Sequence, residues 1–253
     1  FAIPQAKPIF PPEPLAVVYV PPSDEEYIAI EKASAEQLTK LEEQLKQKTN
    51  GLTPPEIKII NEPGNLADNI PNLLKKEKIW MIAMGDKRKV EEGLISRFFL
   101  SSDTYEVISR STCPVLLVPE NCRIKPLKKF AFATDLDRTD FEAIKFLVEL
   151  AEMYNAEIVV AHVISDKLSK ENIIKDLEHL KNLSSRVNYY NIEYEDILAD
   201  EFTESMEEFT RVEEIDVLAM VHKKRTFLER IFHKDMTKQI LDLHNTPLLI
   251  YPE

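Results

Sequence analysis

Two aspartates that follow a short apolar run are the residues in the middle of the chain most suited to polar chemistry. The run is Phe130–Thr134, and Asp135 and Asp137 come after it with one leucine between them. Two neighbouring carboxyl groups act as acid and base in hydrolases when their surroundings separate their pKa values. Aspartates also fit a turn that leads into a helix, because their oxygens accept hydrogen bonds from backbone N–H groups. The second interpretation is favoured, and the first stays open.

The histidines do not form a metal-binding pattern. His162, His222, His233 and His244 each lie at a distance other than three or four residues from another His or Cys, the spacing typical of zinc sites. His162 falls within an apolar run and fits a hydrogen-bonded core residue. The chain also lacks a G-x-S-x-G segment that would present a nucleophilic serine. We therefore expect neither a metal site nor a catalytic set.

The aspartate pair belongs to a predicted β-α-β unit. Apolar runs at 130–134 and 158–164 flank a segment with helical spacing of its apolar residues, namely Phe141, Ile144, Leu147, Val148 and Ala151. Thr139 and Glu142 predict a capping box at the start of this helix, and Asn155 predicts its end. Strands that are apolar throughout suit a parallel sheet covered on both faces. In such open sheets, ligands bind at the carboxyl ends of the strands, which is where the aspartates fall.

The remaining elements also alternate between strands and helices, as in α/β proteins. Helices are predicted at residues 23–49, 65–76, 102–110, 169–183, 202–212 and 235–243. Strands are predicted at 57–60, 79–84, 115–118, 187–194, 217–221 and 248–251. Residues 1–22 are rich in proline and fit an extended segment with a short strand at 15–20.

The composition of the 253-residue chain excludes several classes of protein. Its net charge of −12 disfavours a general binder of nucleic acid or anionic membranes, which needs a basic surface. No apolar run reaches the length that spans a bilayer. The two cysteines, Cys113 and Cys122, fit reduced thiols in a cytosolic protein. With only four glycines in the whole chain, a glycine-rich phosphate loop is hard to build.

An internal repeat divides the chain into two related halves. Residues 77–84 (EKIWMIAM) align with 213–220 (EEIDVLAM) at an offset of 136. Residues 112–119 (TCPVLLVP) align with 245–252 (NTPLLIYP) at an offset of 133. We therefore predict two tandem domains, at residues 1–120 and 127–253, the first with a longer loop.

These residues resemble the universal stress protein family in its tandem two-domain form. The resemblance is carried by FATDLD at 132–137, AEIVVAHV at 156–163, IAMG at 82–85, CPVLLVP at 113–119 and TPLLIYP at 246–252. It implies an α/β fold of two tandem, open, parallel five-stranded sheets in the order 3-2-1-4-5, with helices on both faces. It also implies that members either bind ATP or have lost this ability, and that many dimerise through the last strand.

In ATP-binding members, the resemblance implies a G-x2-G-x9-G-[S/T] segment that brings backbone N–H groups and a helix start to the phosphates. In the second domain the corresponding residues are Val221, Lys224, Lys234 and Asp235. Side chains at glycine positions crowd the phosphates, and the aspartate repels them. The neighbouring basic residues could attract an anion, although a solvated loop is the favoured interpretation.

The first domain keeps more of this segment. Gly85 and Ser102 match, Ser101 replaces the third glycine, and Arg97 is a candidate charge partner for a phosphate. The resemblance also implies that Asp135 lines a nucleotide pocket. We therefore expect any ATP binding to be weak and confined to the first domain.

The first domain departs from the family pattern near its start. The β-α-β unit at 130–164 has no counterpart before Tyr27, so the first domain is expected to be incomplete, without its N-terminal strands. A sheet with that gap leaves backbone groups unpaired. We expect residues upstream of this numbering, or another copy of the chain, to complete the sheet.

The sequence as a whole predicts a cytosolic, non-enzymatic regulator of the universal stress type with degenerate nucleotide sites. One alternative is an ATP-binding protein with slow hydrolysis at the first-domain site, and another is a ligand-free scaffold for protein partners. Because unpaired strand edges promote aggregation, residues 115–118 and 248–251 are expected to pair antiparallel as an internal pseudo-dimer, or else to join copies in a homo-oligomer.

Overall fold

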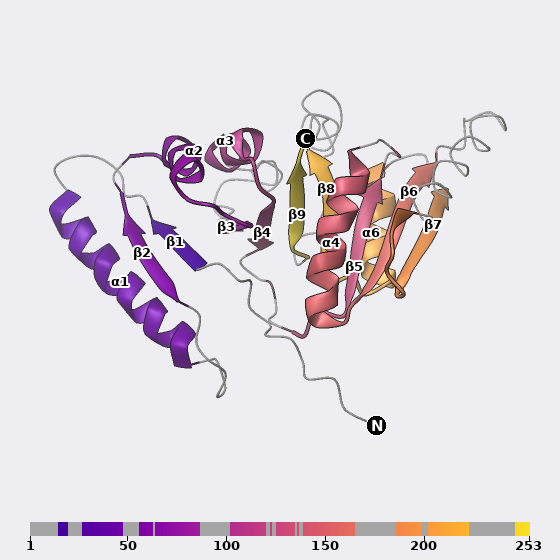
Figure 1. Cartoon of the computed structure of the whole chain (residues 1–253), viewed down its shortest axis with the longest axis horizontal. Coiled ribbons are helices and arrows are strands. Elements are labelled where there is room, and N and C mark those ends of the chain that lie inside the picture. Colours follow the sequence, from indigo (N-terminus) through magenta and orange to yellow (C-terminus); the bar gives the residue numbers. More distant parts are fainter. Residues whose placement is uncertain are drawn as a thin grey trace. The chain divides into compact units, whose positions relative to one another are not determined.

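A computed structural model describes residues 15–19, 27–47, 56–62, 64–86, 102–119, 122, 125–134, 136, 139–164, 186–198, 202–222 and 246–253. The chain forms two compact units, residues 1–80 with 102–112, and residues 81–101 with 113–253. The first unit contains β1 (Leu15–Tyr19), α1 (Tyr27–Gln47), β2 (Ile57–Asn61), α2 (Leu66–Lys76) and α3 (Ser102–Arg110). The second contains β3 (Ile82–Asp86), β4 (Val115–Pro119), β5 (Lys129–Thr134), α4 (Asp140–Tyr154), β6 (Glu157–Ile164), β7 (Ile192–Leu198), α6 (Phe202–Val212), β8 (Val217–His222) and β9 (Leu248–Pro252), all labelled in Figure 1.

The second unit is built on a seven-stranded sheet in the order β3-β4-β9-β8-β5-β6-β7. All neighbouring strands run parallel except β4 and β9. Read from the β7 edge, the five strands β7, β6, β5, β8 and β9 follow the predicted 3-2-1-4-5 order. The α/β fold is therefore confirmed, while the sheets differ in detail from two separate five-stranded ones.

The predicted antiparallel pairing of the two last strands is confirmed. Leu116 lies opposite Leu249, flanked by the pairs Val115–Ile250 and Leu117–Leu248. Prolines at both ends of each strand keep the pairing short, because proline has no N–H to donate. The last strands of the two repeats thus join within one sheet.

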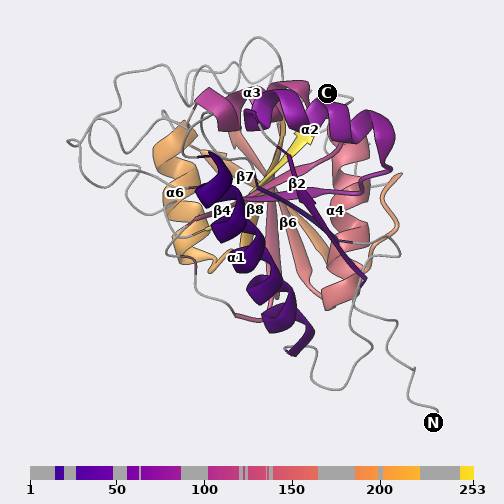
Figure 2. The ribbon, with the colours of Figure 1, turned by 90° about the vertical axis from the view of Figure 1, so that its left-hand side faces the viewer.

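Helices cover both faces of this sheet, as parallel strands require. Figure 2 shows α4 and α6 on opposite sides of it. The α6 face contains a buried cluster of small and large apolar residues that includes Ala131, Ala161, Leu218, Met206 and Phe209. On the α4 face, the Phe130 ring meets the Tyr154 ring edge-on at a centroid distance of 6.4 Å, and Phe132 is fully buried. Alternate side chains of β5 therefore pack into two hydrophobic cores, one on each face of the sheet.

The internal repeat is reproduced by the backbone. Ile82 pairs with Val115 and Leu218 with Leu248, which reproduces both sequence offsets. The helices α2 and α6 span equivalent residues, 66–76 and 202–212. In addition, β1 pairs parallel with β2 as β6 pairs with β7. β1 thus corresponds to β6, one strand of the β-α-β unit. Among the described residues the first repeat has no counterpart of β5 or α4, and the completion of its sheet by upstream residues or by another copy stays a prediction.

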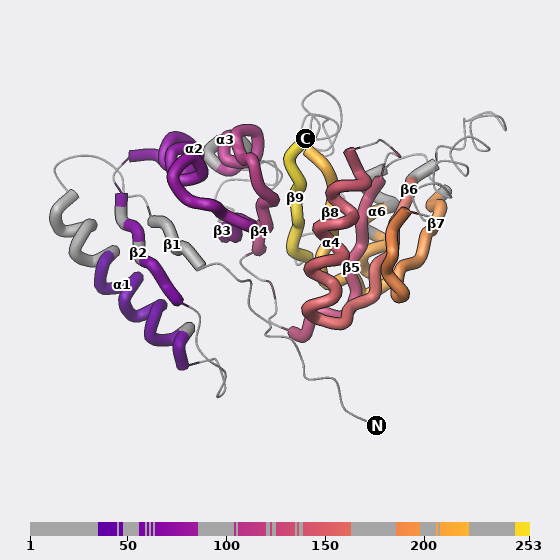
Figure 3. The backbone as a smooth tube through the Cα atoms, viewed as in Figure 1, coloured from indigo at the N-terminus to yellow at the C-terminus, as the bar shows by residue number. Residues whose placement is uncertain are grey.

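Three other expectations about the elements are corrected. The strand predicted at 79–84 is β3 at Ile82–Asp86, and the strand predicted at 187–194 is β7 at Ile192–Leu198. Thr139 precedes α4 without a side-chain capping bond, so the predicted capping box does not form. Asn155 does end the helix, in the left-handed conformation with φ of 54°. The helices predicted at 169–183 and 235–243 lie outside the described residues, which are the coloured parts of Figure 3.

A buried carboxylate fastens the segment before β5 to the start of β8. The Asp216 side chain is 5% exposed and accepts hydrogen bonds from the backbone N–H groups of Lys128 and Lys129, at 2.6 and 2.9 Å. Lys125 Nζ lies 2.5 Å from its other oxygen. Burial alone raises the pKa of Asp216, but the bonds from Lys125, Lys128 and Lys129 together hold it below its ordinary value of 3.8.

In the first unit, α2 and α3 pack together through apolar side chains. Ala67, Ile70 and Leu73 of α2 are buried, as are Val107 and Ile108 of α3. The Asn65 side chain caps α2 by accepting a bond from the Asp68 N–H at 2.7 Å.

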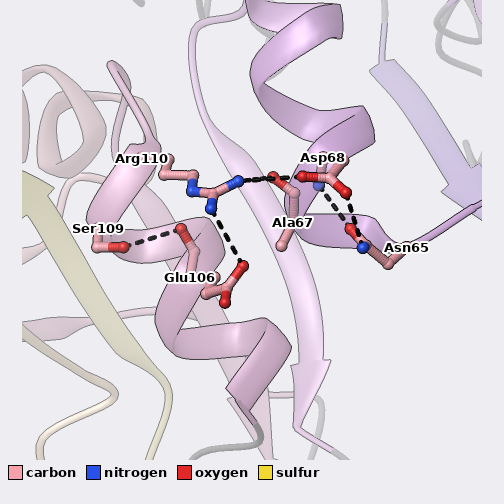
Figure 4. Close-up of polar contacts among 6 residues, drawn as sticks. All are labelled: Asn65, Ala67, Asp68, Glu106, Ser109 and Arg110. Carbon is pink, nitrogen blue, oxygen red and sulfur yellow. Dashed lines mark hydrogen bonds and ion pairs between the residues drawn. The ribbon is translucent and has the colours of Figure 1, made fainter.

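Arg110 connects the two helices by polar contacts, as Figure 4 shows. Its Nη1 donates to the Ala67 carbonyl oxygen at 3.3 Å and lies 3.1 Å from Asp68 Oδ1. Its Nη2 lies 3.5 Å from Glu106 Oε2 within α3. The guanidinium thus links α3 to the first turn of α2.

Replacing Arg110 by alanine is expected to lower the free energy of unfolding by about 0.5–1 kcal/mol, since its side chain is half exposed and water weakens such contacts. Urea denaturation followed by circular dichroism measures the change. Glu106→Ala is the matched control, because it removes only the contact within α3. Equal losses in the two variants would mean that the contacts with α2 contribute nothing.

Candidate functional site

Three polar side chains form a row at the carboxyl ends of adjacent strands in the second repeat. Thr134 of β5 lies opposite His162 of β6, and His162 lies opposite Asp196 of β7. Residues opposite each other in a parallel sheet share a face, so the three side chains lie on the α4 face of the sheet. This is the edge at which open α/β sheets bind ligands.

The turn between β5 and α4 is held by a hydrogen-bonded pair. Thr134 Oγ1 donates to Asp140 Oδ2 at 2.5 Å and accepts from the N–H of Leu136 at 2.9 Å. Thr134 and Asp140 are 4% and 1% exposed. Leu136 has a φ of 65°, a conformation that costs free energy for a residue with a side chain. The Thr134 bond therefore fixes an otherwise unfavourable turn beside the predicted site residue Asp135.

His162 and Tyr194 carry buried polar atoms without a hydrogen-bond partner among the described residues. His162 Nδ1 lies 3.4 Å from Asp196 Oδ1, close enough for an ion pair when the imidazole is protonated. The Tyr194 hydroxyl is buried on the neighbouring strand, and burial raises its pKa to about 12. Buried polar groups are normally hydrogen-bonded. These two atoms therefore indicate that a polar group can be accommodated beside them at this end of the sheet.

The chemistry of this row suits neutral or positively charged groups better than phosphate. The carboxyl group of Asp196 belongs to the row and that of Asp140 is hydrogen-bonded to Thr134, and carboxylates repel an anion. They accept hydrogen bonds from hydroxyl or amino groups. The sequence analysis missed Thr134, Asp140 and Asp196. Aligning the strand ends in a parallel register would have placed Thr134 beside His162.

The structure describes two of the five predicted site residues. Gly85 lies in β3 and is exposed, and Ser102 is the first residue of α3. Arg97, Ser101 and Asp135 lie outside the described residues. The assignment of all five to a nucleotide site stays a prediction.

Gly85 and Val221 occupy equivalent positions in the two repeats, but their surroundings differ. Among the residues that the structure describes, no atom lies within 4 Å of a Cβ atom added to Gly85. Val221 of β8 is 4% exposed, so its side chain is enclosed by the protein. Within the described part of the chain, this position is therefore open in the first repeat, whereas a buried side chain occupies it in the second.

The residues that the structure describes contain no cluster of three or more His, Cys, Asp or Glu side chains able to hold a metal ion. None of the helices described is both long enough and apolar enough to cross a membrane.

Comparison with known proteins gave matches to solved structures but none to curated proteins. A universal stress protein from Archaeoglobus fulgidus DSM 4304 has a TM-score of 0.65 and 13% identity, covering 91% of this chain and 80% of that chain. A putative universal stress protein from Pseudomonas aeruginosa UCBPP-PA14 has a TM-score of 0.60 and 14% identity, covering 94% and 92%. A functionally unknown protein from Pseudomonas aeruginosa PAO1 has a TM-score of 0.59 and 13% identity, covering 94% and 92%. At these identities the likeness concerns the fold alone.

The family assignment comes from a match to the sequence model of a whole family. The model of the universal stress protein family matches this chain twice, at residues 11–119 and at 126–252. The two matches fall on the two halves related by the internal repeat. The chain therefore belongs to the universal stress protein family.

Proposed function

We propose that this protein is a cytoplasmic, non-enzymatic regulator in the stress response, with nucleotide sites that have degenerated to different degrees in its two repeats. Family membership supports a role in stress. The difference between Gly85 and Val221 carries the rest of the proposal. A phosphate needs close approach to backbone N–H groups, which glycine permits and an enclosed valine prevents.

The second repeat fits a nucleotide poorly. Val221 fills the first glycine position with a buried side chain, and the sequence places Lys234 and Asp235 at the third glycine and serine positions. The negative charge of Asp235 would oppose that of a phosphate. The Thr134–His162–Asp196 row adds a further carboxylate at the carboxyl edge. These features favour loss of the nucleotide in this half.

The first repeat retains part of what a phosphate requires. No described residue crowds the Cβ position of Gly85, and Ser102 begins a helix, whose N-terminus attracts anions. The sequence pattern of the family is the basis for proposing Gly85, Arg97, Ser101 and Ser102 as contacts of the first repeat and Asp135 as the contact in the second. With one glycine in place of three, we expect weak ATP binding, with a dissociation constant of about 0.1–1 mM.

Calorimetric titration of the intact chain with MgATP tests this proposal. The heat signal is expected to disappear in Ser102→Asp, which places a negative charge at the helix start, and in Gly85→Val, which reproduces the second repeat. Ser102→Thr keeps the hydroxyl group and is the matched control. Lys234→Gly with Asp235→Ser should strengthen binding in the second repeat, if it changes binding at all.

Other results of this experiment would contradict the assigned contacts or support a different function. Tight binding that is unaffected by Ser102→Asp would refute the assigned contacts. Release of inorganic phosphate from ATP at a rate that falls in Ser102→Asp would identify a slow ATPase instead. Complete absence of heat at millimolar ATP would favour a ligand-free scaffold that acts through protein partners or through self-association.

A further inference from the structure

Two buried polar atoms on β6 and β7 have no hydrogen-bond partner among the described residues. They are Nδ1 of His162 and the hydroxyl oxygen of Tyr194. The His162 side chain is only 10% exposed, so water does not readily take the place of a protein partner. Because a buried polar atom without a partner destabilises the folded chain, these two atoms favour a further polar group beside them.

The register of the sheet places a carboxylate in the same group. Asp196 lies opposite His162, and Tyr194 lies opposite Val160, two residues before His162 on the same face. His162 Nδ1 is 3.4 Å from Asp196 Oδ1, which is longer than an ordinary hydrogen bond. The Asp196 side chain is 27% exposed, so a ligand reaches the group from the side of this carboxylate.

The described neighbours of His162 offer hydrogen-bond acceptors and negative charge. On β5, Thr134 already donates its hydroxyl hydrogen to Asp140 of α4. On β7, burial raises the pKa of Tyr194 to about 12, so its hydroxyl stays neutral. The carboxyl groups of Asp140 and Asp196 disfavour an anion. A ligand that carries hydrogen-bond donors and a positive charge therefore suits this group best.

We propose that His162 and Asp196 bind the ammonium group of a small aliphatic amine. A primary ammonium group combines a compact positive charge with three N–H donors. A nitrogen about 2.9 Å from both His162 Nδ1 and Asp196 Oδ1 donates one hydrogen to each, and its bond to the carboxylate is the stronger because both groups are charged. The third hydrogen is left for the Tyr194 hydroxyl or for water. The ammonium group thus satisfies an atom that the described residues leave unbonded.

This site is independent of the proposed ATP contacts, none of which belongs to it. An ammonium group needs acceptors and negative charge, whereas a phosphate needs donors and positive charge. The same carboxyl edge that fits a nucleotide poorly in the second repeat therefore fits an amine. A failed amine titration would leave the ATP titration of the first repeat unaffected, and the reverse also holds.

Titration of the intact chain with butylamine at pH 8 tests the proposal. Nitrogen-15 nuclear magnetic resonance follows the histidine rings, and His162→Leu identifies which of the five sets of signals belongs to His162. The Nδ1 signal of His162 should lack a hydrogen in the free chain and should shift saturably, with a dissociation constant of about 1 mM. Tetramethylammonium is the matched probe, because it has the same charge but no N–H donor. It should cause no saturable shift.

Two variants of β7 provide the second arm. Asp196→Asn should weaken butylamine binding about tenfold or more, because the ammonium group loses its charged acceptor. Glu195→Gln removes the same charge from the adjacent residue, whose side chain lies on the opposite face of the strand. This control should bind butylamine as the natural chain does. Both residues are exposed, so both variants should keep the fold.

Four results would overturn the proposal. Unchanged affinity in Asp196→Asn would exclude its carboxylate from the site. Equal weakening in Asp196→Asn and Glu195→Gln would reduce the effect to the general negative charge of the chain, and so would equal responses to tetramethylammonium and butylamine. A hydrogen on Nδ1 of the free chain at pH 8 would mean that His162 donates to Asp196 and has no lone pair there for an amine.

Discussion

Replacing Ile250 by aspartate is expected to lower the free energy of unfolding by about 4–6 kcal/mol, the largest effect that we predict for a single substitution. Ile250 is 1% exposed and lies in β9 opposite Val115 of β4 on one side and Met220 of β8 on the other. The variant loses apolar contacts, and its carboxylate lies among the apolar side chains of the described neighbouring strands. Because the change approaches the whole stability of many domains, much of the variant should be unfolded at 37 °C.

Chemical denaturation followed by circular dichroism at 20 °C measures this effect. Ile250→Val is the control, with an expected loss of about 1 kcal/mol, since it removes one methylene and keeps the strand apolar. A loss below about 1 kcal/mol in Ile250→Asp would be incompatible with a strand buried between β4 and β8.

The pairing of β4 with β9 was predictable because the features that favour it lie within the two strands and the prolines beside them. Each is short, apolar, last in its repeat and bounded by prolines, so an unpaired edge was the alternative. The order β7-β6-β5-β8-β9 was predictable from the family resemblance, which implies the order 3-2-1-4-5. The distribution of the first repeat over a seven-stranded and a two-stranded sheet was not, because β1 has only five residues and no helix pattern before it.

Strand ends were misplaced where side chains have partners outside their own segment. The strand predicted from Val187 begins at Ile192 instead, although Tyr189 and Tyr190 have high β propensity. Tyr189 donates its hydroxyl hydrogen to the Ala156 carbonyl oxygen, and the Tyr190 hydroxyl bonds the Asn155 side chain. Both tyrosines thus contact the end of α4, which a local sequence pattern does not reveal.

The candidate site was predictable only in part for the same reason. Aligning the repeats identified Gly85 and Val221 as equivalent, and the structure shows them in different surroundings. The capping box expected from Thr139 is replaced by a bond from Thr134 to Asp140. That bond depends on where β5 ends relative to α4, and spacing along a helix does not determine it.

Replacing Asp216 by asparagine is expected to lower the free energy of unfolding by about 2–3 kcal/mol at pH 7. The carboxylate is buried and accepts bonds from the N–H groups of Lys128 and Lys129, while Lys125 Nζ lies 2.5 Å away. An amide of the same size accepts through one oxygen only and turns an NH₂ group toward donors. The substitution should therefore weaken the connection between the segment before β5 and the start of β8.

The pH dependence of this loss identifies its cause. The folded-state pKa of Asp216 lies below the ordinary value of 3.8, because the bonds from Lys125, Lys128 and Lys129 outweigh the opposing effect of burial. A lowered folded-state pKa contributes stability that is fully present above 3.8 and is lost as the pH falls through the folded pKa. The difference between the natural chain and Asp216→Asn should therefore be constant from pH 7 to about pH 5 and should shrink toward pH 3.

Urea denaturation at several pH values measures that difference. Glu213→Gln is the matched control, since it removes an ion pair of Lys129 and leaves the bonds to Asp216 in place. Its expected loss is below about 1 kcal/mol, because the pair is partly exposed. A loss in Asp216→Asn that stays the same from pH 7 to pH 3 would show that the shape of the side chain, and not its charge, connects the segment before β5 to β8.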